Sequence, residues 1–208
     1  MALTGPGRVG AAIGEFAGTL RRYGPGGSQS IGQQLATNRN VIRFAAGEAL
    51  HPRRFLAGLG AYRDALARQN ALFLQQRVDD VTDAMRHTNA SALVVERVRR
   101  TGATLDVAAS FMRRLGRAHE ADSELAGAHR AASEAMDLHN NELGISLALA
   151  HARGGASASA AGEQALQGAV LRAVADGRAL VLDAPTAAPR PSTAAELRAV
   201  LRDPGLIT

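Results

Sequence analysis

The chain contains no cysteine, no tryptophan and no lysine. Without cysteine, disulfides and thiolate metal sites are excluded, so a bound metal would need histidine, carboxylate or amide ligands. Aromatic residues make up only 3% of the sequence, which leaves few of the stacking side chains usual in proteins that bind single-stranded nucleic acid. Candidate binding or catalytic residues must therefore be sought among the histidines, carboxyl groups, amides and arginines.

Long apolar runs are also missing, because no segment approaches the roughly 18 apolar residues of a membrane span. The N-terminal stretch is interrupted by Gly10, Gly14 and Glu15 and makes a poor signal peptide. We therefore expect no transmembrane segment and a soluble protein, either cytoplasmic in the producing cell or exported without a cleaved leader.

All 24 basic residues are arginines, and the formal net charge is +5. Guanidinium groups offer a planar fork of donors that suits phosphate and carboxylate groups. This composition favours an anionic partner such as nucleic acid or phospholipid. A GC-rich genome that encodes arginine in place of lysine would give the same composition.

Alanine, leucine, arginine and glutamate dominate, and this composition predicts an all-α fold. We expect a single compact multi-helix domain over residues 28–183, with a helical N-terminal arm (1–27) and a C-terminal segment (184–208). Predicted helices cover 8–22, 29–50, 105–121, 134–152 and 161–175, and a long tract over 52–100 is broken near 76–80. Ser133 is the predicted cap of the helix at 134–152. Residues 178–183 are expected to be extended, and 184–192 to form a proline-rich linker before a terminal helix.

Five of the six histidines lie between Arg86 and Arg153. Residues three and four apart share a helix face, so Asp83, Arg86 and His87 are expected to project together. His119 and Glu120 are adjacent in sequence and point about 100° apart, and His119 is the one expected to face a common cavity.

A second polar stripe is predicted on the helix over 134–152, where Asp137, Asn140, Asn141 and Gly144 fall on one face. Asp and Asn are weak helix formers, so three of them in mid-helix favour a site over a solvated surface. Gly144 continues the stripe at a point where a neighbouring backbone or a ligand could approach closely. His139 points roughly opposite Asp137, which makes it a weaker candidate.

These residues could perform two kinds of chemistry. In the first, a carboxylate orients His87 or His119 for general acid or base work while Arg86 and the asparagines stabilise negative charge. In the second, His87, His119 and Asp137 bind a divalent metal that activates water, with an asparagine oxygen as a further ligand. The spacing does not decide between them, because it matches no strong metal signature.

Three short motifs in this order, DAMRH (83–87), AHE (118–120) and MDLHNNELG (136–144), resemble a family of bacterial helical domains with D-A-x-R-H, A-H-E and D-L-x-N-N-x-x-G motifs. Members are associated with candidate polymorphic toxins and secreted effectors. Family members commonly carry aromatics after the R-H pair, whereas TNASA follows His87 here. The resemblance implies a shared polar site made by Asp83, Arg86, His87, His119, Glu120, Asp137, Asn140 and Asn141.

The leading hypothesis is a small hydrolase acting on an anionic phosphodiester or a cell-envelope substrate, as an antibacterial effector with an immunity or export partner. Its catalytic candidates are Asp83, Arg86, His87, His119, Glu120 and Asp137, and its substrate-binding candidates are His139, Asn140 and Asn141. The competing hypothesis is a non-catalytic helical module, an adaptor or loading protein. Nucleic-acid binding without catalysis is a third interpretation.

Overall fold

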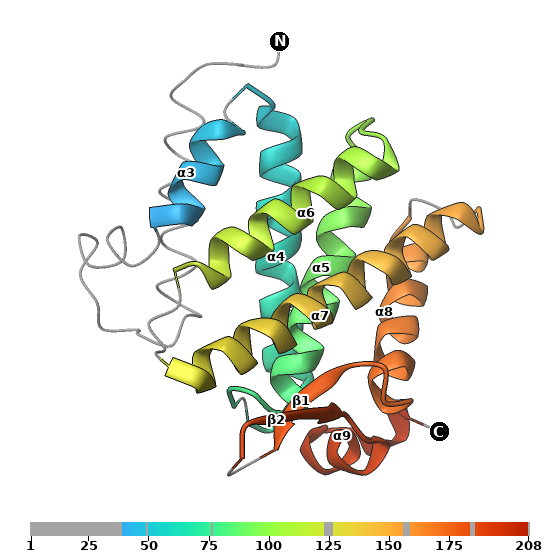
Figure 1. Cartoon of the computed structure of the whole chain (residues 1–208). Coiled ribbons are helices and arrows are strands. Elements are labelled where there is room, and N and C mark those ends of the chain that lie inside the picture. Colours follow the sequence, from blue (N-terminus) through green and yellow to red (C-terminus); the bar gives the residue numbers. More distant parts are fainter. Residues whose placement is uncertain are drawn as a thin grey trace.

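The structure is a computed structural model that describes residues 39–48, 50–75, 77–122, 127–155, 159–183 and 186–207. In this part of the chain it contains seven α-helices and one small two-stranded sheet (Figure 1). The predicted all-α fold class is confirmed. The N-terminal arm and the helix predicted over 8–22 lie outside the described residues.

The elements follow one another with short connections and keep the labels of Figure 1. The helices are α3 (Arg39–Gly47), α4 (Pro52–Leu72), α5 (Val81–Arg99), α6 (Leu105–Glu120), α7 (Gly127–Arg153), α8 (Ala160–Ala175) and α9 (Ala194–Val200). The strands are β1 (Leu180–Asp183) and β2 (Ala188–Pro191), and a short 3-10 helix spans Pro204–Leu206.

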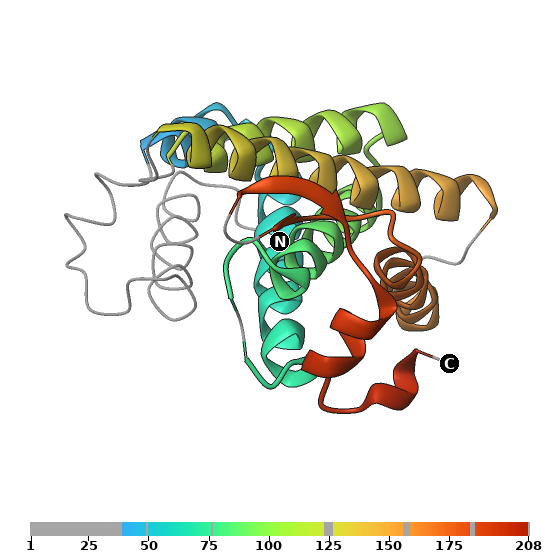
Figure 2. The ribbon, with the colours of Figure 1, turned by 60° about the horizontal axis from the view of Figure 1, so that its bottom comes forward.

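Helix α5 is the centre of the fold, since it contacts α4, α6, α7, α8, α9 and β1. Sixteen of its 19 residues are buried, which is why no clear amphipathic stripe is visible in its sequence. Asp80 begins the helix by accepting hydrogen bonds from the backbone amides of Thr82 and Asp83. The turned view in Figure 2 shows α6 and α7 lying across one side of α4 and α5.

The crossing of α5 and α7 depends on Gly144. A Cβ atom at this position would overlap the carbonyl oxygen of Thr88 and lie 2.9 Å from Cβ of Ser91. Any larger residue would push the two helices apart. The expectation that a neighbouring backbone approaches Gly144 is confirmed, and the neighbour is α5.

The C-terminal part differs from the expected linker. β2 occupies 188–191, within the segment predicted as a proline-rich linker, and pairs antiparallel with β1 from Leu180↔Pro191 to Asp183↔Ala188. Helix α9 then packs on the body through Leu197, which is fully buried. Short-range sequence patterns missed β2 because its strand geometry comes from pairing with β1.

Helix α7 also begins earlier than predicted, at Gly127 instead of residue 134. Ser133 is therefore an interior residue and not a cap, and its hydroxyl donates to Oδ1 of Asp79 at 2.6 Å. Among the described residues, no helix is both long and apolar enough to cross a membrane.

Candidate active site

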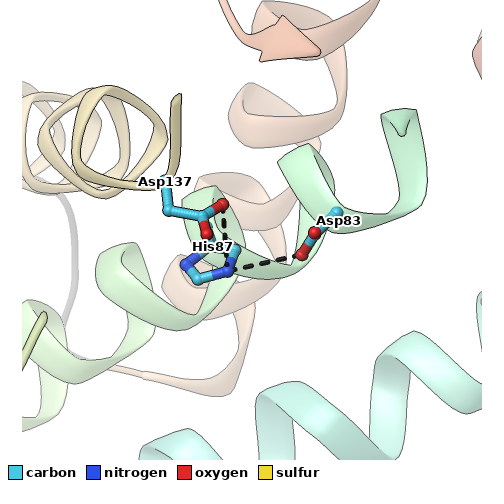
Figure 3. Close-up of side chains that lie close together, drawn as sticks. All are labelled: Asp83, His87 and Asp137. Atoms are coloured by element: carbon cyan, nitrogen blue, oxygen red, sulfur yellow. Dashed lines mark ion pairs between the residues drawn. The ribbon is translucent and has the colours of Figure 1, made fainter. Parts of the chain in front are cut away.

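The centre of the site is His87, which projects from α5 between two carboxyl groups (Figure 3). Its Nε2 atom lies 3.3 Å from Oδ1 of Asp83 on the same helix and 3.2 Å from Oδ1 of Asp137 on α7. All three side chains are more than nine-tenths buried. The close α5–α7 crossing at Gly144 allows carboxyl groups from two helices to reach one imidazole.

Asp83 is held from three sides. Arg86, one turn along α5, donates a hydrogen bond to Oδ1, and the backbone amide of Asp79 donates to Oδ2 at 2.7 Å. Asp79 has a positive φ of 65°, a backbone conformation that is costly for a residue other than glycine. Its own carboxylate contacts Nε2 of His129 at 2.8 Å and accepts from Ser133, so α7 fixes the turn that leads into α5.

The other ring nitrogen of His87 faces an amide. Nδ1 lies 3.4 Å from Oδ1 of Asn141, and the Ser91 hydroxyl donates to the same oxygen at 2.8 Å. A contact of 3.4 Å is longer than an ordinary N–H···O hydrogen bond. The Nδ1 side is therefore the more weakly engaged edge of the ring.

A small cavity of about 30 Å³ is lined by both His87 and Asn141. Its polar lining is Tyr62, Arg86, His87, His119 and Asn141, and its other lining residues are Val41, Ala90, Met112, Leu115 and Gly116. The rings of His87 and His119 have centroids 6.2 Å apart and planes at 41°. Two imidazoles thus line one cavity.

The two histidines differ in protonation. Burial alone would lower the pKa of His87, but the charges of Asp137 and Asp83 outweigh it and raise this pKa to about 9. Burial, together with the positive charges of His87 and Arg86, lowers the pKa of His119 to about 4. At neutral pH His87 is an imidazolium and His119 is a neutral imidazole.

The pKa values of the two carboxyl groups beside His87, Asp83 and Asp137, also differ. Burial would raise the pKa of Asp83, but the hydrogen bond and charge of His87, with Arg86, lower it to about 2. Burial raises the pKa of Asp137 to about 8, because His87 only partly offsets this effect and Asp83 adds to it. Arg86 and His87 are the cations beside the ionised Asp83, and burial raises the pKa of the two other carboxyl groups, Asp137 and Glu120, toward their neutral forms.

A divalent metal is the alternative occupant that the donor set admits. One ligand atom each from Asp83, His87 and Asp137 lies within 4.8 Å of the others, and such a nitrogen and two oxygens could bind one ion. However, the Arg86 guanidinium already neutralises Asp83, and Nε2 of His87 occupies the space between the two carboxyl groups. The arrangement therefore fits an imidazolium more closely than a metal ion.

Three predicted site residues do not line the cavity. Asn140 is fully buried and bonds both the N–H and the C=O of Leu180, so its amide fixes β1 to α7. His139 is exposed, with Nε2 3.0 Å from the Arg178 carbonyl oxygen. Glu120 is buried, and its Oε1 has no hydrogen bond to any described residue.

A family model described as a domain of unknown function, DUF6973, matches residues 48–177, more than half of the chain. The chain belongs to the DUF6973 family. No curated protein and no solved structure matches it. The DUF6973 match contains the His87 cluster, which consists of Asp83, His87 and Asp137, and every cavity residue except Val41.

Two residues within the DUF6973 region were not predicted as site residues, although Asp79 was, with Asp80, a candidate cap of the helix that carries His87. Tyr62 on α4 lines the cavity, and burial raises the pKa of its hydroxyl, so it stays a hydrogen-bond donor at neutral pH. Asp79 orients Asp83 through its backbone amide. No motif marks Tyr62, and Asp79 could have been noticed only as one of two consecutive aspartates before a helix.

Proposed function

We propose that this protein is a hydrolase that cleaves an ester bond in an anionic substrate by acid–base catalysis between His87 and His119. One observation supports this proposal: two imidazoles face one cavity, and their surroundings give them widely separated pKa values. Pairs of titratable groups with separated pKa values are the usual mark of an acid and a base in one site.

In this mechanism the neutral His119 accepts a proton from a water molecule, and the oxygen of that water attacks the phosphorus or carbonyl carbon. The bond to the leaving oxygen breaks, and His87 supplies the proton that this oxygen needs. The proton comes from Nδ1, because Asp83 and Asp137 hold Nε2. Solvent then returns His119 and His87 to their starting protonation states.

Arg86 and the positive charge on His87 support the choice of an anionic substrate. They lie beside the cavity, where charge is stabilised more strongly than in water. A bound anion would also offset the two positive charges that lower the pKa of His119 and so make it a better base.

The test is hydrolysis of small dialkyl phosphates, whose alkoxide leaving groups need a proton, with small alkyl carboxylic esters as a second series. We expect kcat to be highest between about pH 4 and pH 9, the pKa values of the two histidines, and to fall on both sides. His119→Ala should lower kcat by about 10²–10⁴-fold. The matched control is His139→Ala, a surface histidine, which should leave kcat unchanged. Equal activity in His119→Ala and the wild type would refute the acid–base pair.

The proposed role as an antibacterial effector needs a separate test. Wild-type protein and His87→Ala would be expressed inducibly in bacteria and directed in turn to the cytoplasm and the periplasm. Growth arrest by the wild type alone supports an effector hydrolase, and the sensitive compartment separates a nucleic-acid substrate from an envelope substrate. Normal growth in both compartments with folded protein argues for the non-catalytic helical module.

A further inference from the structure

Polar side chains line only part of the cavity wall. The lining residues on α6 are Met112, Leu115, Gly116 and His119, which form one stripe along this helix. Met112 and His119 are seven residues apart, which places them about 10 Å apart along the helix axis. The cavity wall thus changes along α6 from the imidazole at one end to apolar side chains at the other.

The helices that face α6 across the cavity, α5 and α3, also divide into a polar and an apolar part. On α5, Arg86 and His87 lie at the polar end, and Ala90 follows them about one turn later. Val41 of α3 adds a further apolar side chain. It is held in place because Asp122 accepts hydrogen bonds from the backbone amides of Asn40 and Val41 at distances of 2.9–3.0 Å. α3 therefore completes the apolar wall at a fixed position.

We infer that the ligand of this cavity carries a short unbranched apolar chain next to its anionic group. The chain would lie against Val41, Ala90, Met112 and Leu115, while the anionic group meets Arg86 and His87. This inference rests on the proposed function for the orientation of the ligand, and it adds a substrate class to it: esters that join a short alkyl or acyl group to an anionic part.

The cavity volume limits the length of the chain. A volume of about 30 Å³ holds about two or three water molecules. A methylene group is about as large as one water molecule, and the anionic group shares the cavity, so the chain has at most about three carbon atoms. Leu115 and Met112 are both buried, so a longer chain would need one of them to move.

The experiment measures binding without turnover. Alkylphosphonates have a carbon–phosphorus bond that a hydrolase of esters does not cleave, so methyl-, propyl- and octylphosphonate are titrated into the full chain by calorimetry. Each methylene that enters the cavity should tighten binding by about fourfold, which makes propylphosphonate about 15-fold tighter than methylphosphonate. Octylphosphonate should bring no further gain. A matching series of acetate, butanoate and nonanoate shows whether the anionic group is a phosphoryl or a carboxylate group.

Variants at Leu115 test where the alkyl chain of the ligand lies in the cavity. Leu115→Ala should extend the gain in affinity to chains that are one or two carbons longer. Leu143→Ala removes the same atoms from a buried position on α7 that does not line the cavity, and it should leave the length dependence unchanged. Leu115→Met, a swap of similar volume, serves as a second variant should Leu115→Ala fail to fold.

Equal affinity for all chain lengths in both series, or no binding at all, would overturn the inference. So would a length dependence that Leu115→Ala and Leu143→Ala change equally. These outcomes are distinct from failure of the proposed function. Chain-length-dependent binding without ester hydrolysis would leave the ligand class standing and remove the catalysis, and hydrolysis that is indifferent to chain length would do the reverse.

Discussion

The two ends of helix α5 both bury carboxyl groups, but they compensate them differently. At the C-terminal end, Glu96, Glu163 and Asp64 share three arginines, Arg97, Arg99 and Arg100. At the N-terminal end, the cations that the described part of the chain places beside Asp83, Asp137 and Glu120 are Arg86 and His87.

The consequence is visible in the pKa values. A hydrogen bond from Arg97 lowers the pKa of Glu163, as in an ordinary ion pair. Burial raises the pKa of Asp137 and of Glu120, and each has a buried oxygen without a hydrogen bond to a described residue. Burial of charge by itself therefore does not mark a functional site in this fold. What distinguishes the N-terminal end is that its carboxyl groups outnumber the cations beside them.

The largest expected effect is a difference in hydrolysis rate between variants at the two ends of α5. His87→Ala should lower the hydrolysis rate by about 10²–10⁴-fold, because the proposed acid is lost, and should also destabilise the fold, because Asp83 and Asp137 lose the cation between them. Glu96→Gln should affect stability alone. It leaves the rate within about twofold but lowers the free energy of unfolding by about 2–3 kcal/mol, since Glu96 accepts several charged hydrogen bonds. Rate assays and urea unfolding of both variants check this, and similar profiles for the two would erase the distinction.

The next effect concerns the helix crossing that supports the N-terminal cluster. Gly144→Ala should destabilise the protein by about 1–3 kcal/mol and reduce activity, because the new methyl group overlaps the Thr88 carbonyl. Gly60→Ala on α4 is the matched control, since a Cβ there meets nothing within 4 Å. It should stabilise the helix by up to about 1 kcal/mol. Unaltered activity in Gly144→Ala would mean that the crossing does not set the site geometry.

A smaller effect is expected from pH. The pKa of His87 in the folded protein, about 9, is above the ordinary value of 6.5. Its contribution to stability is therefore complete below pH 6.5 and is lost as the pH rises through 9. Asp137, with a pKa of about 8, releases its proton over the upper part of the same range.

We expect the thermal midpoint to fall between pH 6.5 and pH 9, and to fall less in Asp137→Asn, which stays uncharged. His87 and Asp137 interact directly, so the two protons should leave as a coupled pair. Differential scanning calorimetry at half-unit pH steps measures the slope. A midpoint that rises over this range would contradict the assigned protonation states.

The smallest expected effect is that of a chelator. Because Arg86 and His87 already compensate Asp83, removal of divalent ions with EDTA should leave both activity and thermal midpoint unchanged. Restoration of lost activity by a single added metal would instead assign Asp83, His87 and Asp137 as ligands.

Sequence reasoning recovered the parts of this molecule that depend on helix periodicity. The shared face of Asp83, Arg86 and His87 follows from their spacing, and the all-α class follows from composition. Asn140 shows where periodicity stops being informative. It is three residues from Asp137, yet it bonds the backbone of β1, since a helix face about 100° wide can contact two different neighbours.

The remaining features come from contacts between distant segments. Ser133 has the character of a cap, but its hydroxyl bonds Asp79, which is 54 residues away. The strand β2 exists through its pairing with β1. Tyr62 reaches the cavity only because α4 packs along α5. None of these partners lies within the local sequence of the residue concerned.

Asp79 connects the site to the C-terminal hairpin of β1 and β2. Its carbonyl oxygen accepts from the amide of Leu182 in β1 at 2.9 Å, and its own amide donates to the carboxylate of Asp83. Two hydrogen bonds thus connect the C-terminal hairpin to the group that orients His87, although the hairpin adds no side chain to the cavity. The DUF6973 match ends at residue 177, before this hairpin begins. A chain shortened to the matched region would keep the His87 cluster but lose the support that sets its geometry, so the stretch recognisable by sequence is smaller than the unit that must fold for the site to form.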